Sequence, residues 1–157
     1  MIALLQRVRE ARVTVGEECV GEIGVGLLVF AGFTREDDET RVDQMLGRIL
    51  GYRVFPDSDG RMNLDLAAIS GALLLAPQFT LAASTRKGRR PSFEPAAPPE
   101  VARRLFDRLV EYARTRHQPV ASGRFGADMQ IALINDGPVT FILSSGDSNS
   151  HNSQITR

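Results

Sequence analysis

The dipeptide Gly137-Pro138 is the feature that most constrains how this chain folds, because it separates two apolar runs. The runs, Met129 to Ile134 and Val139 to Leu143, have the composition of β-strands. Proline has no amide hydrogen and cannot donate to a sheet ladder, so the dipeptide predicts a bend between the two strands. A bend of this kind leaves backbone carbonyl oxygens unpaired. An ordinary turn would also explain the dipeptide when it is taken alone.

A second polar stretch follows a buried apolar run in the middle of the chain. The run Ala72 to Ala76 is the best candidate for a central strand, which we expect to extend to Gln78. The hexapeptide Ala76-Pro77-Gln78-Phe79-Thr80-Leu81 closes the run, and Thr80 to Ala83 is expected to continue as strand. Judged from this local pattern alone, Thr80 would be a strand threonine on a buried face.

The remaining periodicities predict a mostly β domain with two helices. Apolar residues at helical spacing predict helices from Thr34 to Gly51 and from Pro98 to His117. Thr34-Arg35-Glu36-Asp37 resembles a capping box at the start of the first helix. Further strands are expected over Met1 to Val8, Ala11 to Val15, Glu18 to Ile23, Leu27 to Phe33, Tyr52 to Phe55, Arg61 to Leu64 and Val120 to Ser122. The predicted fold class is therefore α/β, a single compact domain with a mostly β core and two packed helices.

Composition and charge exclude several classes of function. The chain has 157 residues, 43% hydrophobic and 24% charged, which is typical of one globular domain. The formal net charge is zero, so any contact with RNA must be local rather than a broad electrostatic attraction. The single cysteine, Cys19, excludes an internal disulfide, and we expect it to be half-buried. No apolar run approaches the ~18 residues of a membrane span, and Met1 to Leu5 is interpreted as a strand, so we expect a soluble cytoplasmic protein with no membrane partner.

The usual side chains of hydrolytic enzymes are missing from recognisable motifs. Of the two histidines, His117 ends the second helix and His151 lies in the polar C-terminal segment. Neither has a neighbouring serine or cysteine in a nucleophile motif, and no Gly-x-Ser-x-Gly sequence occurs. No His-x-x-x-His or Cys-x-x-Cys spacing predicts a metal site. A hydrolase built from this chain would lack the usual side-chain base, and we expect neither a metal nor another cofactor.

Taken together, the two polar stretches resemble the signature of the D-aminoacyl-tRNA deacylases. That family carries Ser-Gln-x-Thr-Leu and Asn-x-Gly-Pro-x-Thr motifs, and this chain has Pro77-Gln78-Phe79-Thr80-Leu81 and Asn135-Asp136-Gly137-Pro138-Val139-Thr140. The resemblance covers Met1 to about Leu143, and Pro77 departs from the family serine. Shorter matches continue it in the same order: Gln6-Arg7-Val8, Gly21-Glu22-Ile23-Gly24, Met62-Asn63, Arg90-Pro91-Ser92-Phe93 and Gly123-Arg124-Phe125-Gly126-Ala127-Asp128-Met129.

The resemblance implies a partly closed barrel that acts as a homodimer on the 3′ end of D-aminoacyl-tRNA. If the chirality filter works by excluding L side chains, glycyl-tRNA is expected to be a substrate as well. The RNA 2′-hydroxyl would assist cleavage while the backbone amides of Phe79 and Thr80 hold the oxyanion, with Thr80 as a positioning residue or nucleophile. A cis Gly137–Pro138 bond would reach the partner's active site and exclude L side chains. The candidate site residues are Gln78, Phe79 and Thr80 for catalysis, Gly137 and Pro138 for chirality, Arg7 for loop support, and Phe125 and Met129 for the adenine pocket.

A dense basic cluster in a long loop is the candidate RNA contact. The loop Ser84 to Pro99 contains Lys87, Arg89 and Arg90, which we interpret as tRNA phosphate ligands, with Phe93 as an anchor. A solvated charged loop is the alternative. Residues 144–157 offer almost nothing to bury and are expected to be a flexible polar tail after a deacylase-like domain of residues 1–143.

Two other functions stay open at this point. A related deacylase group that removes mischarged L-alanine has proline at the position of Pro77, but alanine at the position of Phe79. Phe79 and the Asp136-Gly137-Pro138 context favour the D-specific activity. A tRNA-binding module without catalysis is the second alternative, because the chain lacks a side-chain base.

Overall fold

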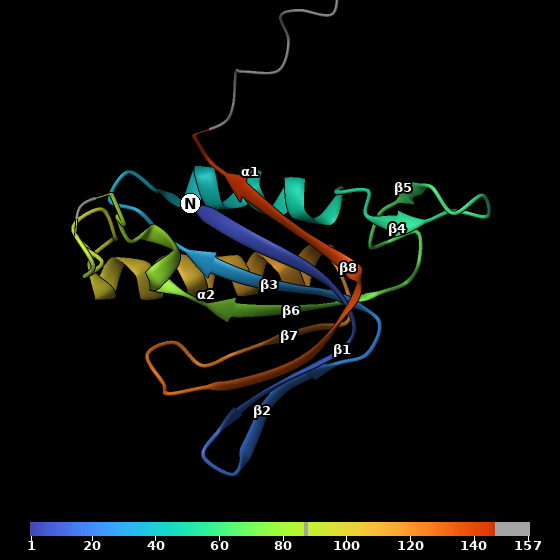
Figure 1. The fold of residues 1–157 in the computed structure, drawn as a ribbon, viewed down its shortest axis with the longest axis horizontal. Helices are drawn as coiled ribbons and strands as arrows, with labels where there is room; N and C mark the ends of the chain where they lie inside the picture. The colour runs from blue at the N-terminus through green and yellow to red at the C-terminus, as the bar shows by residue number, and fades with distance from the viewer. Residues whose placement is uncertain (87, 147–157) are drawn as a thin grey trace, which may run out of the picture.

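Strand β1 (Ile2–Val15) is the spine of the sheet in the computed structural model, which describes residues 1–86 and 88–146. Its first half pairs with β3 (Gly26–Gly32) and its second half with β2 (Glu18–Ile23), both antiparallel. Along its other side β1 pairs with β8 (Gln130–Ser144), also antiparallel. Beyond β3 the sheet continues in parallel through β6 and β7, which span Ala72–Pro77 and Val120–Ser122 (Figure 1).

The sheet curls until β2 approaches β7 across its open side. Gly21 on β2 shows how closely they approach, since a Cβ there would lie 2.9 Å from the carbonyl oxygen of Ser122 on β7 and 3.1 Å from Cδ1 of Leu74. Any larger residue would push the strands apart. The sheet is therefore nearly closed and barrel-like, which confirms the predicted fold class.

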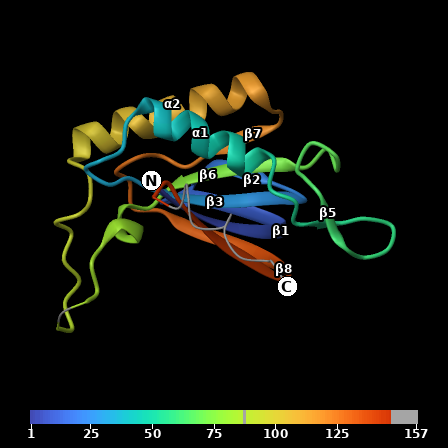
Figure 2. The ribbon, with the colours of Figure 1, turned by 90° about the horizontal axis from the view of Figure 1, so that it is seen from above.

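Two helices cover one face of this sheet. Helices α1 (Glu39–Leu50) and α2 (Pro99–Arg116) run beside each other on the same side (Figure 2). Arg108 of α2 donates to both carboxylate oxygens of Asp43 on α1, at 3.0 and 2.6 Å, and this forked pair joins the helices. Their apolar stripes face the sheet and consist of Val42, Met45, Leu46 and Ile49 on α1 and Ala102, Leu105, Phe106, Leu109, Val110 and Ala113 on α2.

Strands β3 and β6 are buried on both faces. Leu27 and Val29 of β3 pack in the core under the helices. Leu28 instead lies inside the curled sheet together with Leu74 of β6. Strands covered on both faces carry apolar residues in continuous runs rather than alternating ones. The prediction of a central strand from Ala72 onward is confirmed by the position of β6 between β3 and β7.

Several boundaries differ from the predictions. The two strands expected in the first 15 residues are one continuous strand, because β8 pairs along nearly all of β1 and keeps it extended through two register shifts. The first helix begins at Glu39 rather than Thr34, and its N-cap is Asp38, whose side chain accepts from the amide of Arg41 at 2.8 Å. The predicted capping box is therefore wrong, since its residues lie before the helix.

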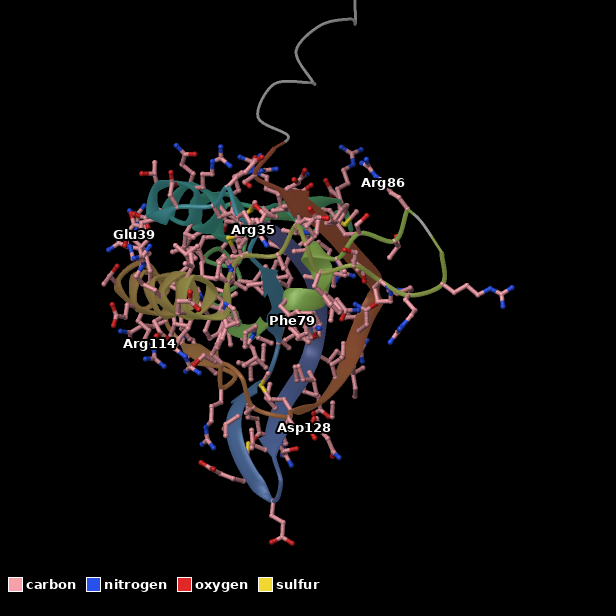
Figure 3. All side chains as sticks on the ribbon, turned by 90° about the vertical axis from the view of Figure 1, so that its left-hand side faces the viewer. Arg35, Glu39, Phe79, Arg86, Arg114 and Asp128 are labelled. Carbon is pink, nitrogen blue, oxygen red and sulfur yellow. The ribbon has the colours of Figure 1, made fainter. Side chains whose placement is uncertain are left out.

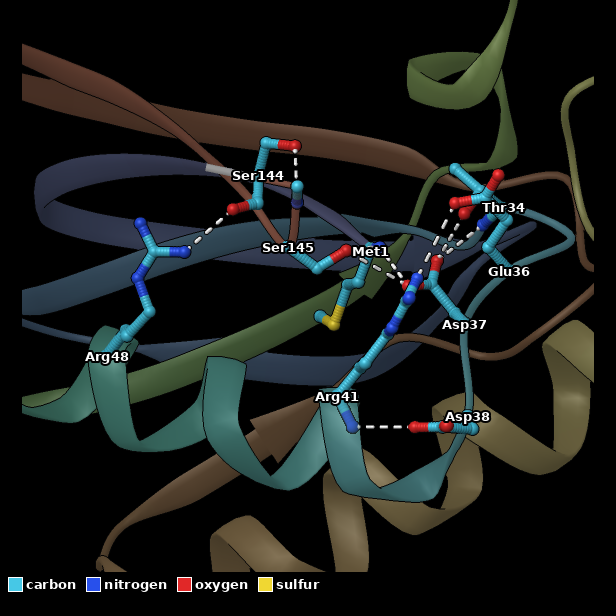
Figure 4. A network of polar contacts seen from close by, with 10 residues as sticks. Met1, Thr34, Glu36, Asp37, Asp38, Arg41, Arg48, Ser144 and Ser145 are labelled. Atoms are coloured by element: carbon cyan, nitrogen blue, oxygen red, sulfur yellow. Dashed lines mark hydrogen bonds and ion pairs between the residues drawn. The ribbon is translucent and has the colours of Figure 1, made fainter. Parts of the chain in front are cut away.

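Asp37 ties together three segments at the start of α1 (Figure 4). Its carboxylate accepts from the amide and hydroxyl of Thr34, at 2.7 and 2.9 Å, and from the amino group of Met1. The hydroxyl of Ser145 also donates to it, at 3.1 Å. Burial alone would raise the pKa of Asp37, but the hydrogen bonds from Met1 and Thr34 outweigh burial and hold that pKa below its usual value.

Replacing Asp37 with asparagine is expected to lower the free energy of unfolding at pH 7 by about 1–3 kcal/mol, because buried donors lose a charged acceptor. A carboxylate with a depressed folded pKa stabilises the fold above its unfolded pKa of ~3.9, and this contribution disappears as the pH falls through the folded value. Urea unfolding of both proteins between pH 7 and pH 3 measures the difference. A difference that stays constant down to pH 3 would contradict the ionised state assigned to Asp37.

The last described residues are attached to the body of the domain. Ser144 ends β8, and its carbonyl accepts from Nη1 of Arg48 at 2.7 Å. The amide of Ser145 donates to the carbonyl of Met1 at 2.8 Å. Ordered structure thus continues past the predicted boundary at Leu143. Residues 147–157 lie outside the described residues, and the flexible tail expected there stays a prediction.

Candidate active site

A largely apolar pocket lies at the ends of β3 and β6, where the chain turns away from the sheet. Its volume is about 440 Å³. Three segments line it: the turn after β6, the start of α2, and the stretch that leads into β8. The lining residues are Pro77, Gln78, Phe79, Ala97, Pro99, Ala102, Phe125, Gly126, Ala127, Met129 and Ile131.

The turn after β6 is a short 3₁₀-helix, η1 (Phe79–Ala82). The predicted continuation of the strand through Thr80 is wrong, because β6 ends at Pro77 and the chain turns there. Thr80 is exposed, rather than buried on a strand face, and its hydroxyl accepts from the side-chain amide of Gln78. Gln78 and Phe79 thus line the pocket, and Thr80 lies next to them in contact with Gln78.

Close packing against β3 holds η1 in place. A Cβ at Gly32, the last residue of β3, would lie 2.8 Å from the carbonyl oxygen of Gln78 and 2.9 Å from Cβ of Leu81. The amide of Gln78 donates to the carbonyl of Ala31 at 2.8 Å. The bonds of η1 itself are donated by later residues, such as Leu81 and Ala83. Within the described residues, the amides of Phe79 and Thr80 have no backbone acceptor, as is usual in the first turn of a helix.

Phe125 and Met129 form an apolar wall of the pocket. The ring of Phe125 packs against Phe106 of α2, with 6.2 Å between the ring centroids. The sulfur of Met129 would lie 2.9 Å from a Cβ at Gly123, so a larger residue there would displace the methionine side chain. Both side chains are half-buried, and both line the cavity.

The Gly-Pro dipeptide sits on a bulge in the middle of β8. Gln6 pairs with Thr140 and Val8 pairs with Asn135, so residues 136–139 bulge out opposite Arg7 alone. The Gly137–Pro138 bond is cis, in agreement with the expectation from the resemblance, and both residues are exposed. They do not line the pocket of their own chain.

Arg7 lies beneath this bulge. Its Nε donates to the carbonyl of Asp136 at 3.1 Å, and its Nη1 donates to the carbonyl of Val54 at 2.6 Å. The carboxylate of Asp136 lies 3.3 Å from Arg7 and 3.0 Å from Arg9. Gly137 has a φ of +118°, and a Cβ there would lie 2.6 Å from Nη2 of Arg7. The predicted supporting arginine is thus in direct contact with the loop.

Asn135 is a site residue that sequence reasoning did not single out. Its side-chain amide donates to the carbonyls of Arg7 and Val139, each at 3.0 Å. These two bonds replace ladder bonds that the bulge interrupts, and they close the loop at its base. The motif Asn-x-Gly-Pro already drew attention to this asparagine in the sequence. Its two hydrogen-bond acceptors, however, can be identified only from the structure.

The basic loop forms a separate arm beside η1. Ser84 and Ser92 exchange two backbone hydrogen bonds at 2.8 and 2.9 Å, which close the arm at its base. The ring of Phe93 packs on Phe79, with 5.1 Å between the centroids, so the predicted anchor contacts the site. Figure 3 shows Arg86 on this arm and Phe79 below it. Arg89 and Arg90 are exposed, and Lys87 lies outside the described residues.

Other titratable groups lie away from the pocket. His117 caps the end of α2, and its Nε2 lies 2.7 Å from the carbonyl oxygen of Gly71. Cys19 is exposed, which corrects the expectation of a half-buried residue, because it follows the tip of the β1–β2 hairpin. In residues 1–86 and 88–146, no three histidine, cysteine, aspartate or glutamate side chains could hold a metal ion. None of the described helices is long and apolar enough to cross a membrane.

Comparison with known proteins gives consistent results. A family model described as D-Tyr-tRNA(Tyr) deacylase matches residues 4–144. The chain is 61% identical over 143 residues to a D-aminoacyl-tRNA deacylase of Methylococcus capsulatus, covering 91% of this chain and 94% of the relative. It is 60% identical over 145 residues to a D-aminoacyl-tRNA deacylase of Alkalilimnicola ehrlichii, covering 92% and 97%.

Two solved structures have a similar fold. The c-Myc DNA Unwinding Element Binding Protein superposes with a TM-score of 0.87 at 37% identity, covering 92% of this chain and 98% of the other. A probable eukaryotic D-amino acid tRNA deacylase superposes with a TM-score of 0.77 at 20% identity, covering 90% and 97%. At that identity, the second likeness concerns the fold alone.

Proposed function

The chain belongs to the D-Tyr-tRNA(Tyr) deacylase family and hydrolyses the ester bond of D-aminoacyl-tRNA, and from this premise we propose that the pocket beside η1 is its active site. The observation that carries the proposal is a pair of consecutive amides, Phe79 and Thr80, without backbone acceptors among the described residues. Phe79 lines the apolar cavity, and Thr80 follows it in η1. The cavity would receive the terminal adenosine, and the amides would face the ester.

The proposed mechanism relies on the backbone and on the substrate. Attack of water on the ester carbonyl generates an oxyanion, which the amides of Phe79 and Thr80 would stabilise by roughly 3 kcal/mol per donor. Collapse of the oxyanion breaks the bond to the 3′-oxygen of the terminal ribose. The neighbouring 2′-hydroxyl would pass the proton of the water to that leaving oxygen, so that no side-chain base is needed. The hydroxyl of Thr80 accepts from the side-chain amide of Gln78, and an amide is not a base that could activate it. A positioning role for both side chains fits this geometry better than a nucleophilic role.

Discrimination between D- and L-aminoacyl groups would depend on a second copy of the chain. Gly137 and Pro138 are exposed and lie outside the pocket of their own chain, so they can act on substrate only in another protomer's pocket. In the proposed homodimer, their carbonyls accept from the substrate amino group and leave no space for an L side chain. Selection by exclusion predicts that D-amino acids of many sizes and glycine are accepted. We place this activity in the cytoplasm, where aminoacyl-tRNA is used in translation.

L-alanyl-tRNA editing is the second candidate, and Pro77 at the pocket is the observation that favours it. The ring of Pro77 lacks both the hydroxyl and the amide hydrogen of the family serine, but leaves the amides of Phe79 and Thr80 intact. Initial rates of release of D-tyrosine, L-tyrosine, glycine and L-alanine from charged tRNA distinguish the two functions. We expect D-tyrosine and glycine to be released and L-tyrosine to be retained. Faster release of L-alanine than of D-tyrosine would instead assign the editing activity.

Removing the charges of Arg89 and Arg90 is expected to weaken tRNA binding. If each arginine binds one phosphate, the slope of log affinity against log salt becomes shallower by ~0.7–0.9 for each phosphate that is no longer neutralised. Filter binding of charged tRNA at several salt concentrations measures the slope for the double alanine variant. Arg114→Ala, on the exposed face of α2, is the matched control (Figure 3). An unchanged slope in the double variant would show that the arm is a solvated loop that does not bind tRNA phosphates.

A further inference from the structure

Arg103 of α2 contacts Phe125, one of the residues that line the pocket. Its guanidinium carbon lies over the ring of Phe125, 4.9 Å from the centroid. Its Nη2 donates to the carbonyl of Phe125 at 3.5 Å and would lie 3.3 Å from a Cβ at Gly126. Phe125, Gly126 and the preceding helix residue, Ala102, all line the pocket. The guanidinium group therefore remains exposed while it contacts residues that line the cavity.

Among the described residues, the positive charge of Arg103 has no ion-pair partner. Arg7, Arg9, Arg12, Arg41, Arg108 and Arg124 each lie within 4.0 Å of a carboxylate. No carboxylate in that part of the chain lies so close to Arg103, although Glu100 and Asp107 are near it on the same helix. It is also exposed, so most of its five donors remain available to a ligand.

The proposed substrate supplies an anion at this place. An adenosine inside an apolar pocket must leave through the rim, where its 5′-phosphate connects to the rest of the RNA. None of the described residues that line the pocket is charged, so the lining offers no partner for that phosphate. The first turn of α2 also reaches the pocket through Pro99, and the positive end of a helix dipole favours an anion there.

We propose that Arg103 binds the 5′-phosphate of the terminal nucleotide of the tRNA while it stacks on Phe125. A guanidinium group suits both tasks, because its face interacts with an aromatic ring and its edge donates paired hydrogen bonds to phosphate oxygens. The contact would fix the direction in which the RNA leaves the pocket. This inference rests on the proposed function, specifically on adenosine occupying the pocket.

Two ligands that differ only in the phosphate test the contact. One is 3′-deoxy-3′-(D-alanylamino)adenosine, a non-hydrolysable analogue, and the other is the same molecule with a 5′-phosphate. Calorimetric titration of the unmodified protein should show about tenfold tighter binding of the phosphorylated ligand at low salt. Arg103→Ala should remove this preference, and Arg103→Lys should retain part of it. Arg104→Ala, one residue along the same helix, should leave it unchanged.

The outcomes separate the inference from the proposed function. Phe125→Ala should weaken the binding of both ligands. If this variant binds both as tightly as the unmodified protein does, or if the unmodified protein binds neither, the proposal of an adenosine pocket is wrong. If Phe125→Ala weakens both but Arg103→Ala keeps the phosphate preference, only the phosphate contact is wrong. Equal weakening of both ligands by Arg103→Ala would reduce Arg103 to a support for the ring, and would likewise overturn the proposed contact.

Discussion

Replacing Gly137 with alanine is expected to lower kcat/KM for D-tyrosyl-tRNA about 100-fold and to leave the domain folded. The added methyl group would lie 2.6 Å from Nη2 of Arg7 and 2.9 Å from Cγ2 of Val139. Arg7 cannot move aside freely, because it donates to the carbonyls of Asp136 and Val54. The loop must therefore shift, and a displacement of about 1 Å in a substrate-positioning element can cost ~10²-fold in rate.

A second glycine with a positive φ but no close neighbour serves as a control for the loss of a glycine. Gly16, in the β1–β2 turn, also has a positive φ, of +58°, but a Cβ there would meet nothing within 4 Å. Gly16→Ala should therefore lose about 1 kcal/mol of stability and keep normal activity. Steady-state rates and melting temperatures of both variants provide the comparison. If Gly137→Ala hydrolyses D-tyrosyl-tRNA at the normal rate, the shape of this loop does not control the reaction.

Much of the scaffold could be predicted because its strands are buried on both sides. Continuous apolar runs such as Ala72 to Ala76 have no polar alternation and indicate a central position directly. The helices were predictable from their apolar stripes, although the start of α1 was not. Thr34 and Asp37 carry capping chemistry, but they use it on each other and on Met1 before the helix begins. A local motif does not show which partner its side chains will find.

The candidate site was predictable as residues but not as an arrangement. The motifs identified Thr80 and Gly137, yet only the fold shows that Thr80 follows a sharp turn and that Gly137 lies outside the pocket of its own chain. Asn135 and Arg103 act through contacts with residues distant in sequence, Arg7 and Phe125. Such contacts depend on the register of β8 and on the packing of α2, and neither follows from residue spacing.

The amide hydrogen of Phe79 can be removed selectively, and this tests the proposed oxyanion site most directly. Phe79→Pro deletes the N–H group, and proline is tolerated in the first turn of a helical segment, where that group has no helical acceptor. The preceding residue, Gln78, has φ −144° and ψ 83°, which lies outside the α region that a following proline disfavours. Removing one oxyanion donor is expected to lower kcat by about 10²–10³-fold.

Phe79→Ala is the matched control for this substitution. It also removes the ring, and with it the packing against Phe93, but it keeps the amide hydrogen. We expect Phe79→Ala to retain kcat within about tenfold, and Thr80→Ala, which also keeps both amides, to retain residual activity. Single-turnover hydrolysis of D-tyrosyl-tRNA measures the chemical step in all three variants. Equal rates for Phe79→Pro and Phe79→Ala would reject the amide as an oxyanion donor. A covalent acyl-enzyme trapped on Thr80 would replace the proposed mechanism with nucleophilic catalysis, because the ester would then pass to the threonine hydroxyl before water releases it.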